Sequence, residues 1–162
     1  MPTYDIQFAN KLAEVSVTLI KEQPEQLEAR RSVIYLSRLS IELSLKALLE
    51  RAGKPVELIR KHSHNLRALL TEVDQCEVLA EVAPGRRLWV PASRLRSVDV
   101  SFIGHSITLG MVIEAENHGA SVYPNEIRYG ENIKDIVPEA LAPAALRLSA
   151  WIQENWDGLR SH

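Results

Sequence analysis

The sequence predicts an all-α protein, an up-and-down bundle of four to five helices within one domain that spans residues 1–162. Three observations support this prediction. Apolar residues recur every three to four positions in several long segments, as they do on one face of a helix. Several prolines and glycines fall between those segments, where helices end. The connections are short, which favours antiparallel neighbours in a bundle.

The first predicted helix covers residues 4–22. Its apolar residues follow the spacing of a single helical face, and they are Phe8, Leu12, Val15 and Leu19. Thr3 is the residue that we expect to cap its N-terminus. Pro24 ends the pattern and suits the first turn of the next helix.

The second predicted helix, residues 24–52, carries the strongest signal. Two apolar stripes cover much of its circumference, which is typical of a central helix; they comprise Ile34, Ile41, Leu45, Leu48 and Ala52, and Leu36, Leu43 and Ala47. A row of charged residues spaced by four is expected on a wetter face, where it would form ion pairs: Arg38, Glu42, Lys46 and Glu50. Gly53 suits a left-handed C-terminal cap.

The remaining segments are predicted as follows. Residues 65–82 form a helix whose apolar face includes Cys76, and residues 83–98 form a loop or a broken helical linker because they contain two prolines and a glycine. Residues 99–118 form a helix, although "VDVSF" also alternates like a strand. Residues 118–132 form a loop, and the last helix covers about 143–160, with Pro138 and Pro143 as first-turn residues.

Composition narrows the classes of function. A net charge of −2 provides no global attraction for nucleic acid, so such binding needs a local basic patch. The single cysteine excludes an internal disulfide and a multi-cysteine metal site, and we expect no metal and no cofactor. No long apolar run or signal peptide is visible, so we expect no membrane insertion and a cytoplasmic location.

The segment "ARRSVIYLSRLSIELSLKALLERAGK", followed by "HSHNLRALL", resembles the HEPN family of small helical-bundle proteins. The matching residues lie between positions 25 and 72, and they are Glu42, Leu43, Leu45, Lys46, Ala47, Leu48, Leu49, His64, Asn65, Leu66 and Leu69. A weaker likeness covers 123–130, where Arg128-Tyr129-Gly130 is similar to the family's Arg-Tyr-Pro element. The resemblance implies an HEPN-like bundle and a homodimer. It also implies RNA or a nucleotide as ligand, and an antitoxin or a nucleotidyltransferase as partner.

Nuclease members of that family carry an arginine, four to six residues, and then a histidine. Here Arg60 and His64 have only three residues between them, so this motif is missing. We therefore expect a non-catalytic RNA- or nucleotide-binding module in a bacterial stress, defence or toxin–antitoxin setting. One alternative is a metal-independent endoribonuclease that uses Arg60 with His62 or His64. Another is an adaptor that binds only a partner protein.

Two basic clusters are candidate phosphate sites. Arg60, Lys61 and Arg67 flank the start of a helix, where free N–H groups attract anions, although solvated surface charge is the favoured explanation. The second cluster surrounds Trp89 in residues 83–98 and suits single-stranded RNA, unless Trp89 only anchors the loop to the core. Its arginines are Arg86, Arg87, Arg94 and Arg96.

Two further pairs need an interpretation. His62 and His64 project apart on a helix, so they are more simply part of a helix start that Ser63 or Asn65 caps. Glu42 and Lys46, one turn apart, form either a surface ion pair or, as the resemblance implies, polar residues that line a cleft.

Overall fold

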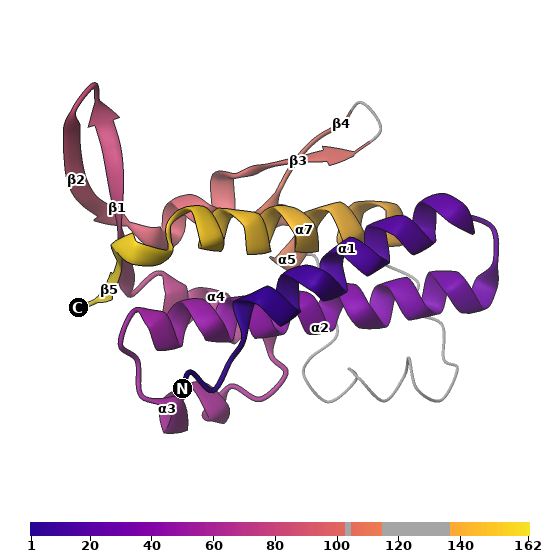
Figure 1. Ribbon diagram of the computed structural model, residues 1–162, viewed down its shortest axis with the longest axis horizontal. Coiled ribbons are helices and arrows are strands. Elements are labelled where there is room, and N and C mark those ends of the chain that lie inside the picture. The colour runs from indigo at the N-terminus through magenta and orange to yellow at the C-terminus, as the bar shows by residue number, and fades with distance from the viewer. Residues whose placement is uncertain (103–104, 115–136) are drawn as a thin grey trace.

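The computed structural model describes residues 1–102, 105–114 and 137–162. These residues form a core of helices and, in addition, two antiparallel sheets, so the prediction of an all-α bundle is wrong (Figure 1). The helices are α1 (Ile6–Glu22), α2 (Leu27–Arg51), α3 (Val56–Lys61), α4 (Leu66–Val73), α5 (Leu109–Glu114) and α7 (Pro138–Glu154). The strands are β1 (Cys76–Ala83), β2 (Arg86–Pro91), β3 (Asp99–Phe102), β4 (His105–Thr108) and β5 (Leu159–Ser161).

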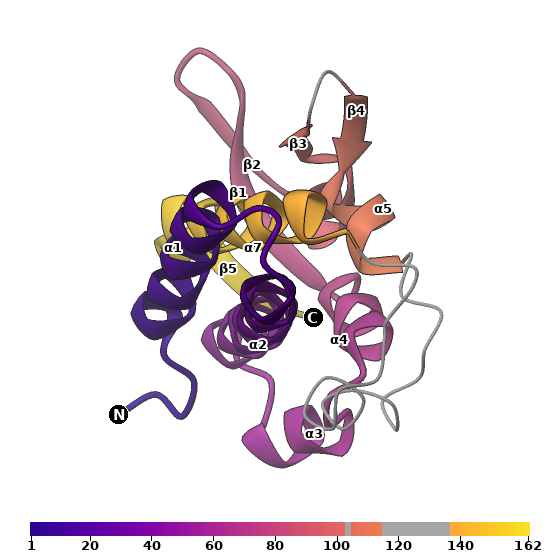
Figure 2. The ribbon, with the colours of Figure 1, turned by 90° about the vertical axis from the view of Figure 1, so that its right-hand side faces the viewer.

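Helix α2 is the central element, as the two apolar stripes predict. It packs against α1, α4 and α7, and Figure 2 shows it in end view among these neighbours. Ile41, Leu45 and Leu48 are fully buried. Gly53, with φ of 94°, follows the last turn in the left-handed region that glycine adopts readily.

Helix α1 presents a different face to the core from the apolar one that its pattern suggests. Asp5, not Thr3, caps it by accepting hydrogen bonds from the N–H groups of residues 7 and 8. The buried face is made largely of small residues, Ala9, Ala13 and Ser16, with Ile6 and Ile20 at its ends. Small side chains let α1 approach α2 closely enough for Ser40 Oγ to donate to the Ala9 carbonyl at 2.7 Å.

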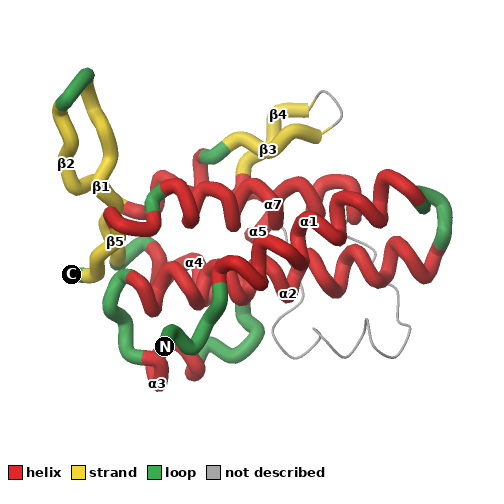
Figure 3. Tube along the Cα trace, viewed as in Figure 1, coloured by secondary structure: helices red, strands yellow, loops and turns green. Residues whose placement is uncertain are grey.

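The predicted helix over residues 65–82 is wrong in its second half. Helix α4 ends at Val73, and β1 then pairs with β2 around a turn in which Gly85 has φ of 72° (Figure 3). The loop predicted for residues 83–98 is therefore a strand, β2, followed by a 3₁₀ helix, Ala92–Ser97. A strand forms here because "CEVLAEVA" follows a period of two, which is the period of side chains along a β-strand rather than a helix.

The C-terminal strand completes this sheet, whose order is β2-β1-β5. Beyond α7 a short 3₁₀ turn, Trp156–Gly158, leads into β5, and Ser161 N donates to the Ala52 carbonyl at 2.7 Å. The last predicted helix thus ends earlier than expected. Pro138 does begin α7, but Pro143 lies inside it, where it cannot donate to the carbonyl four residues earlier.

The helix predicted for residues 99–118 is wrong over residues 99–102 and 105–108, but it is correct over residues 109–114. Strands β3 and β4 form a second sheet, with Val100 opposite Ile107, and α5 follows directly. The alternation in "VDVSF" was thus the correct signal. The predicted loop over 118–132, including Arg128 and Tyr129, lies outside the described residues.

Within the described ranges, no helix is both long and apolar enough to cross a membrane.

Candidate functional site

The row of charged residues on α2 lies inside the protein rather than on a solvent-exposed face of the helix. Arg38, Glu42 and Lys46 are all buried, and Glu50 is half-buried. Arg38 shares one helical stripe with Glu42, Leu45 and Leu49, all of which are buried. The prediction that this face is solvated is therefore wrong, because the chain before α1 and the α3–α4 turn pack over it.

Glu42 is the centre of this buried polar group. Its Oε1 accepts a hydrogen bond from Lys46 Nζ at 2.7 Å, and its Oε2 accepts one from His64 Nδ1 at 2.9 Å. Both carboxylate oxygens are therefore engaged, as a buried charge requires. The side chains of Glu42 and Lys46 are only 4% and 10% exposed, whereas that of His64 is 44% exposed. Lys46 Nζ also lies over the ring of Tyr4, 5.6 Å from its centroid.

The α3–α4 turn is what brings His64 to Glu42. Ser63 adopts φ of 49°, and Asn65 caps α4 by accepting a hydrogen bond from Ala68 N at 3.0 Å. Of the two capping residues that we predicted, Asn65 is thus the one used. Because a carboxylate oxygen can only accept a hydrogen bond, Nδ1 of His64 must carry the proton that it donates to Glu42, and this contact orients the ring.

The two histidines do not form a metal site. His62 turns to Glu72, with Nε2 at 3.6 Å from a carboxylate oxygen, whereas His64 turns to Glu42. Over the part of the chain that the structure describes, no group of three or more suitable side chains is arranged to hold a metal ion.

Three exposed cations flank the same turn. Arg60 and Lys61 end α3, and Arg67 lies in the first turn of α4. None of the three forms an ion pair with another described residue. We call Arg60, Lys61, His64 and Arg67 the corner cluster. It combines exposed positive charge with a histidine that hydrogen-bonds a buried carboxylate, an arrangement suited to binding phosphate oxygens.

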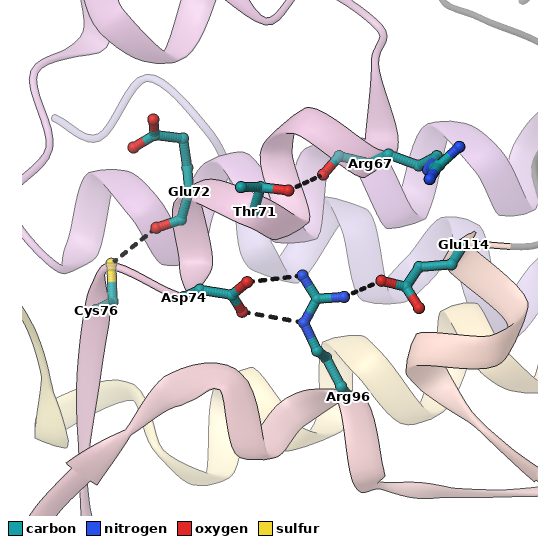
Figure 4. Close-up of polar contacts among 7 residues, drawn as sticks. All are labelled: Arg67, Thr71, Glu72, Asp74, Cys76, Arg96 and Glu114. Atoms are coloured by element: carbon teal, nitrogen blue, oxygen red, sulfur yellow. Dashed lines mark hydrogen bonds and ion pairs between the residues drawn. The ribbon is translucent and has the colours of Figure 1, made fainter.

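Arg96, a predicted phosphate-binding residue, is held by acidic partners instead (Figure 4). Its Nε and Nη2 donate to the two carboxylate oxygens of Asp74 at 3.0 and 2.8 Å, and Nη1 donates to Glu114. The hydrogen bonds to Asp74 raise the pKa of Arg96 further above its usual range. This guanidinium ties the end of α4 to α5, so it is not available to a ligand.

The other residues of the basic stretch lie on the β1–β2 hairpin or just after it. Arg86 and Arg87 are exposed on β2, and Arg94 is exposed on the 3₁₀ helix. Trp89 is 37% exposed, but the guanidinium of Arg160 from β5 covers its ring at 4.0 Å. A base could therefore stack on this face of Trp89 only after it displaced Arg160.

The two basic groups do not meet in one cleft. The β1–β2 hairpin and α3 lie at opposite sides of the helical core in both views (Figures 1 and 2). The predicted phosphate-binding residues are thus divided between the corner cluster and the hairpin.

Sequence reasoning missed the burial of Arg38 and the contacts that Tyr4 and Arg160 make. The burial of Arg38 could have been inferred from its spacing to Leu45 and Leu49. The contacts of Tyr4 and Arg160 have no such signal, because each depends on a terminal segment folding onto a distant element.

Comparison of the chain with models of known protein families, with curated proteins and with solved structures found no match.

Proposed function

We propose that this protein is a non-catalytic binding module for phosphate groups of RNA or of a nucleotide, and that the corner cluster is its binding surface. The observation that carries the proposal is the contact of His64 with buried Glu42, beside three cations without acidic partners among the described residues. Arginine and lysine side chains left unpaired beside a positioned hydrogen-bonding group are the chemistry that phosphate recognition uses. The bacterial stress, defence or toxin–antitoxin setting is an expectation from the resemblance alone.

Fluorescence anisotropy with a labelled single-stranded RNA tests this proposal. The triple variant Arg60→Gln/Lys61→Gln/Arg67→Gln is measured across a series of KCl concentrations. Each phosphate contact contributes about 0.7 to the log–log salt slope for single strands, so the slope should fall by about 2. The matched control, Arg86→Gln/Arg87→Gln/Arg94→Gln, removes the same charge from the hairpin side and should keep the slope.

A competition arm separates the two sources of phosphate. ATP that displaces the RNA from the wild type indicates a nucleotide site, whereas ATP without effect indicates an RNA surface. Binding that survives in the corner variant and disappears in the hairpin variant contradicts the proposed site. If neither RNA nor ATP binds at low salt, the proposed function is contradicted.

A metal-independent endoribonuclease is the second candidate, and one contact favours it. A carboxylate that orients a half-exposed histidine is the usual support of a general acid or base, and Glu42 stands in this relation to His64. Arg60 would stabilise the phosphorane-like state. Incubation of the protein with mixed RNA in EDTA tests this candidate: cleavage that disappears in His64→Ala supports it, and intact RNA excludes it.

A further inference from the structure

The outer half of the β1–β2 hairpin projects from the helical core (Figure 1). Every residue from 81 to 89 is exposed, including the apolar side chains of Val82, Leu88 and Trp89. In the sheet order β2-β1-β5, β2 is an edge strand that is paired on one side only. An edge strand of this kind offers its outward backbone groups to a further strand.

The register of the sheet determines where the backbone groups of β1 point. Along an antiparallel pair, residues that bond to the partner strand alternate with residues that point away from it. Ser161 N donates to the Ala52 carbonyl, so Ser161 points away from β1. Its neighbour Arg160 therefore bonds to its partner Glu77, and the backbone groups of Glu77 point to β5. The next residue of β1, Val78, consequently points to β2.

The same alternation assigns the free groups of β2. Val78 pairs with Val90, so Val90 bonds to β1, and so does Leu88 two residues earlier. Arg87 and Trp89 then direct their N–H and C=O groups away from β1. The part of the chain that the structure describes provides no hydrogen bond to these outward groups.

The charge beside this edge is positive. Arg86 and Arg87 are exposed, and neither forms an ion pair within the described ranges. Glu81 lies opposite Arg87 in the register, but its carboxylate accepts a hydrogen bond from Gly85 N at 3.0 Å, inside the turn. The two guanidinium groups are therefore left to pair with the carboxylates of a partner.

We propose that the free edge of β2 is a docking site for an extended acidic segment of a partner protein, which adds a strand antiparallel to β2. Main-chain hydrogen bonds to Arg87 and Trp89 supply the affinity, and the side chains of β2 select the sequence. The inference does not rest on the proposed function.

The side chains of β2 determine the kind of segment that fits. Because side chains alternate between the two faces of a sheet, Arg87 and Trp89 face one side, and Arg86 and Leu88 face the other. A docked strand thus meets one arginine and one apolar side chain on each face. In antiparallel order, the fitting segment has two apolar residues followed by two acidic ones.

Two other occupants match this edge less well. A second copy would bring four arginines, Arg86 and Arg87 of each chain, to one short edge, and like charges across an interface select against that pairing. A single RNA strand has no row of alternating N–H and C=O groups to match the edge. Arg160 also covers one face of Trp89 against a stacked base.

Fluorescence anisotropy with a labelled peptide that contains Thr-Val-Val-Glu-Glu measures docking. A contact of about five residues is smaller than a standard interface, so we expect a dissociation constant of about 10 to 100 μM. Arg86→Gln/Arg87→Gln should raise it about three- to tenfold, since each exposed ion pair contributes little. The matched control, Arg60→Gln/Lys61→Gln, removes the same charge from the corner cluster and should leave it unchanged.

Backbone pairing has a test of its own. The first valine of the peptide lies opposite Trp89, and N-methylation there removes an N–H that bonds to β2, so binding should weaken at least about tenfold. The second valine lies opposite Leu88, where its N–H points away from β2, and N-methylation there should leave the affinity unchanged. Hydrogen exchange followed by NMR should show that the peptide slows exchange of the Arg87 and Trp89 amides.

Circular dichroism checks that the variants fold alike. The proposal is overturned if the peptide does not bind, if both charge variants weaken binding equally, or if the two methylated peptides behave alike. Slower exchange of the Arg87 and Trp89 amides at high protein concentration alone identifies a second copy at the edge. Slower exchange with single-stranded RNA, in the absence of peptide binding, identifies a nucleic-acid site, and either result overturns the proposal.

Discussion

Replacing Glu42 by glutamine removes the charge that compensates Lys46 inside the protein. At the observed 2.7 Å and an effective dielectric constant of 20, the attraction between the two charges is about 6 kcal/mol. Desolvation costs several kcal/mol for each ion, so the intact pair contributes little compared with apolar residues of the same size. The single variant loses the attraction but still buries the ammonium group, and this costs about 3 kcal/mol.

A double-mutant cycle isolates that coupling. We expect Glu42→Gln to lower the free energy of unfolding by about 3 kcal/mol, and Lys46→Met and the double variant by about 2 kcal/mol each. The coupling energy is then about 3 kcal/mol, measured by urea denaturation at neutral pH. His64 continues to hydrogen-bond the carboxylate in Lys46→Met, which is why that variant loses less.

The exposed pair Lys11–Glu14 is the matched control for the cycle. Its atoms are 2.5 Å apart, but its side chains are 69% and 45% exposed. Solvent screening should leave no measurable coupling between Lys11→Met and Glu14→Gln. The reasoning is refuted if the Glu42 and Lys46 effects simply add, or if the surface pair couples as strongly as the buried one.

Three further outcomes follow from the structure. Burial opposes ionisation of Glu50, but the backbone N–H donors of residues 3 and 4 outweigh it and lower the pKa of this carboxyl below 4.5. Glu50→Gln should therefore lower the free energy of unfolding by about 1 to 2 kcal/mol at neutral pH. In urea titrations, this difference between the wild type and the variant should shrink as the pH falls below 4.5. Burial raises the pKa of Cys76 to about 11, so iodoacetamide should modify it at neutral pH only after denaturation. In Gly158→Ala the new Cβ would lie 2.9 Å from Leu79 Cβ, and the melting temperature should fall in line with a loss of about 1 to 3 kcal/mol.

Apolar periodicity correctly predicted the buried face of a helix where the apolar residues themselves form that face. The pattern of α2 was sufficient because its apolar stripes run almost all the way round, so any packing buries most of them. In α1 the same reasoning found the apolar stripe but not the buried face. A face of alanine and serine has little hydrophobic signal, yet it packs most closely, because small side chains allow two helices to approach.

The β1–β2 hairpin shows a second kind of failure. Leu69, Val73 and Cys76 fit a helical face, so the pattern seemed to continue past the end of α4. The change of period falls after Asp74 and Gln75, and a short run that follows does not by itself distinguish helix from strand. The strand is stabilised on both sides, by β2 next in the chain and by β5 from the C-terminus.

By itself, the sequence determined that α2 is central, that Gly53 ends it, and that a helix begins after Ser63 or Asn65, because apolar spacing and capping chemistry act over a few residues. Tertiary structure alone decided that Glu42, Lys46 and His64 form one group, that Arg96 is held by Asp74 and Glu114, and that Phe8 and Val15 of α1 are exposed. Which residues lie in water depends on every element that packs over them, and no local pattern contains that information.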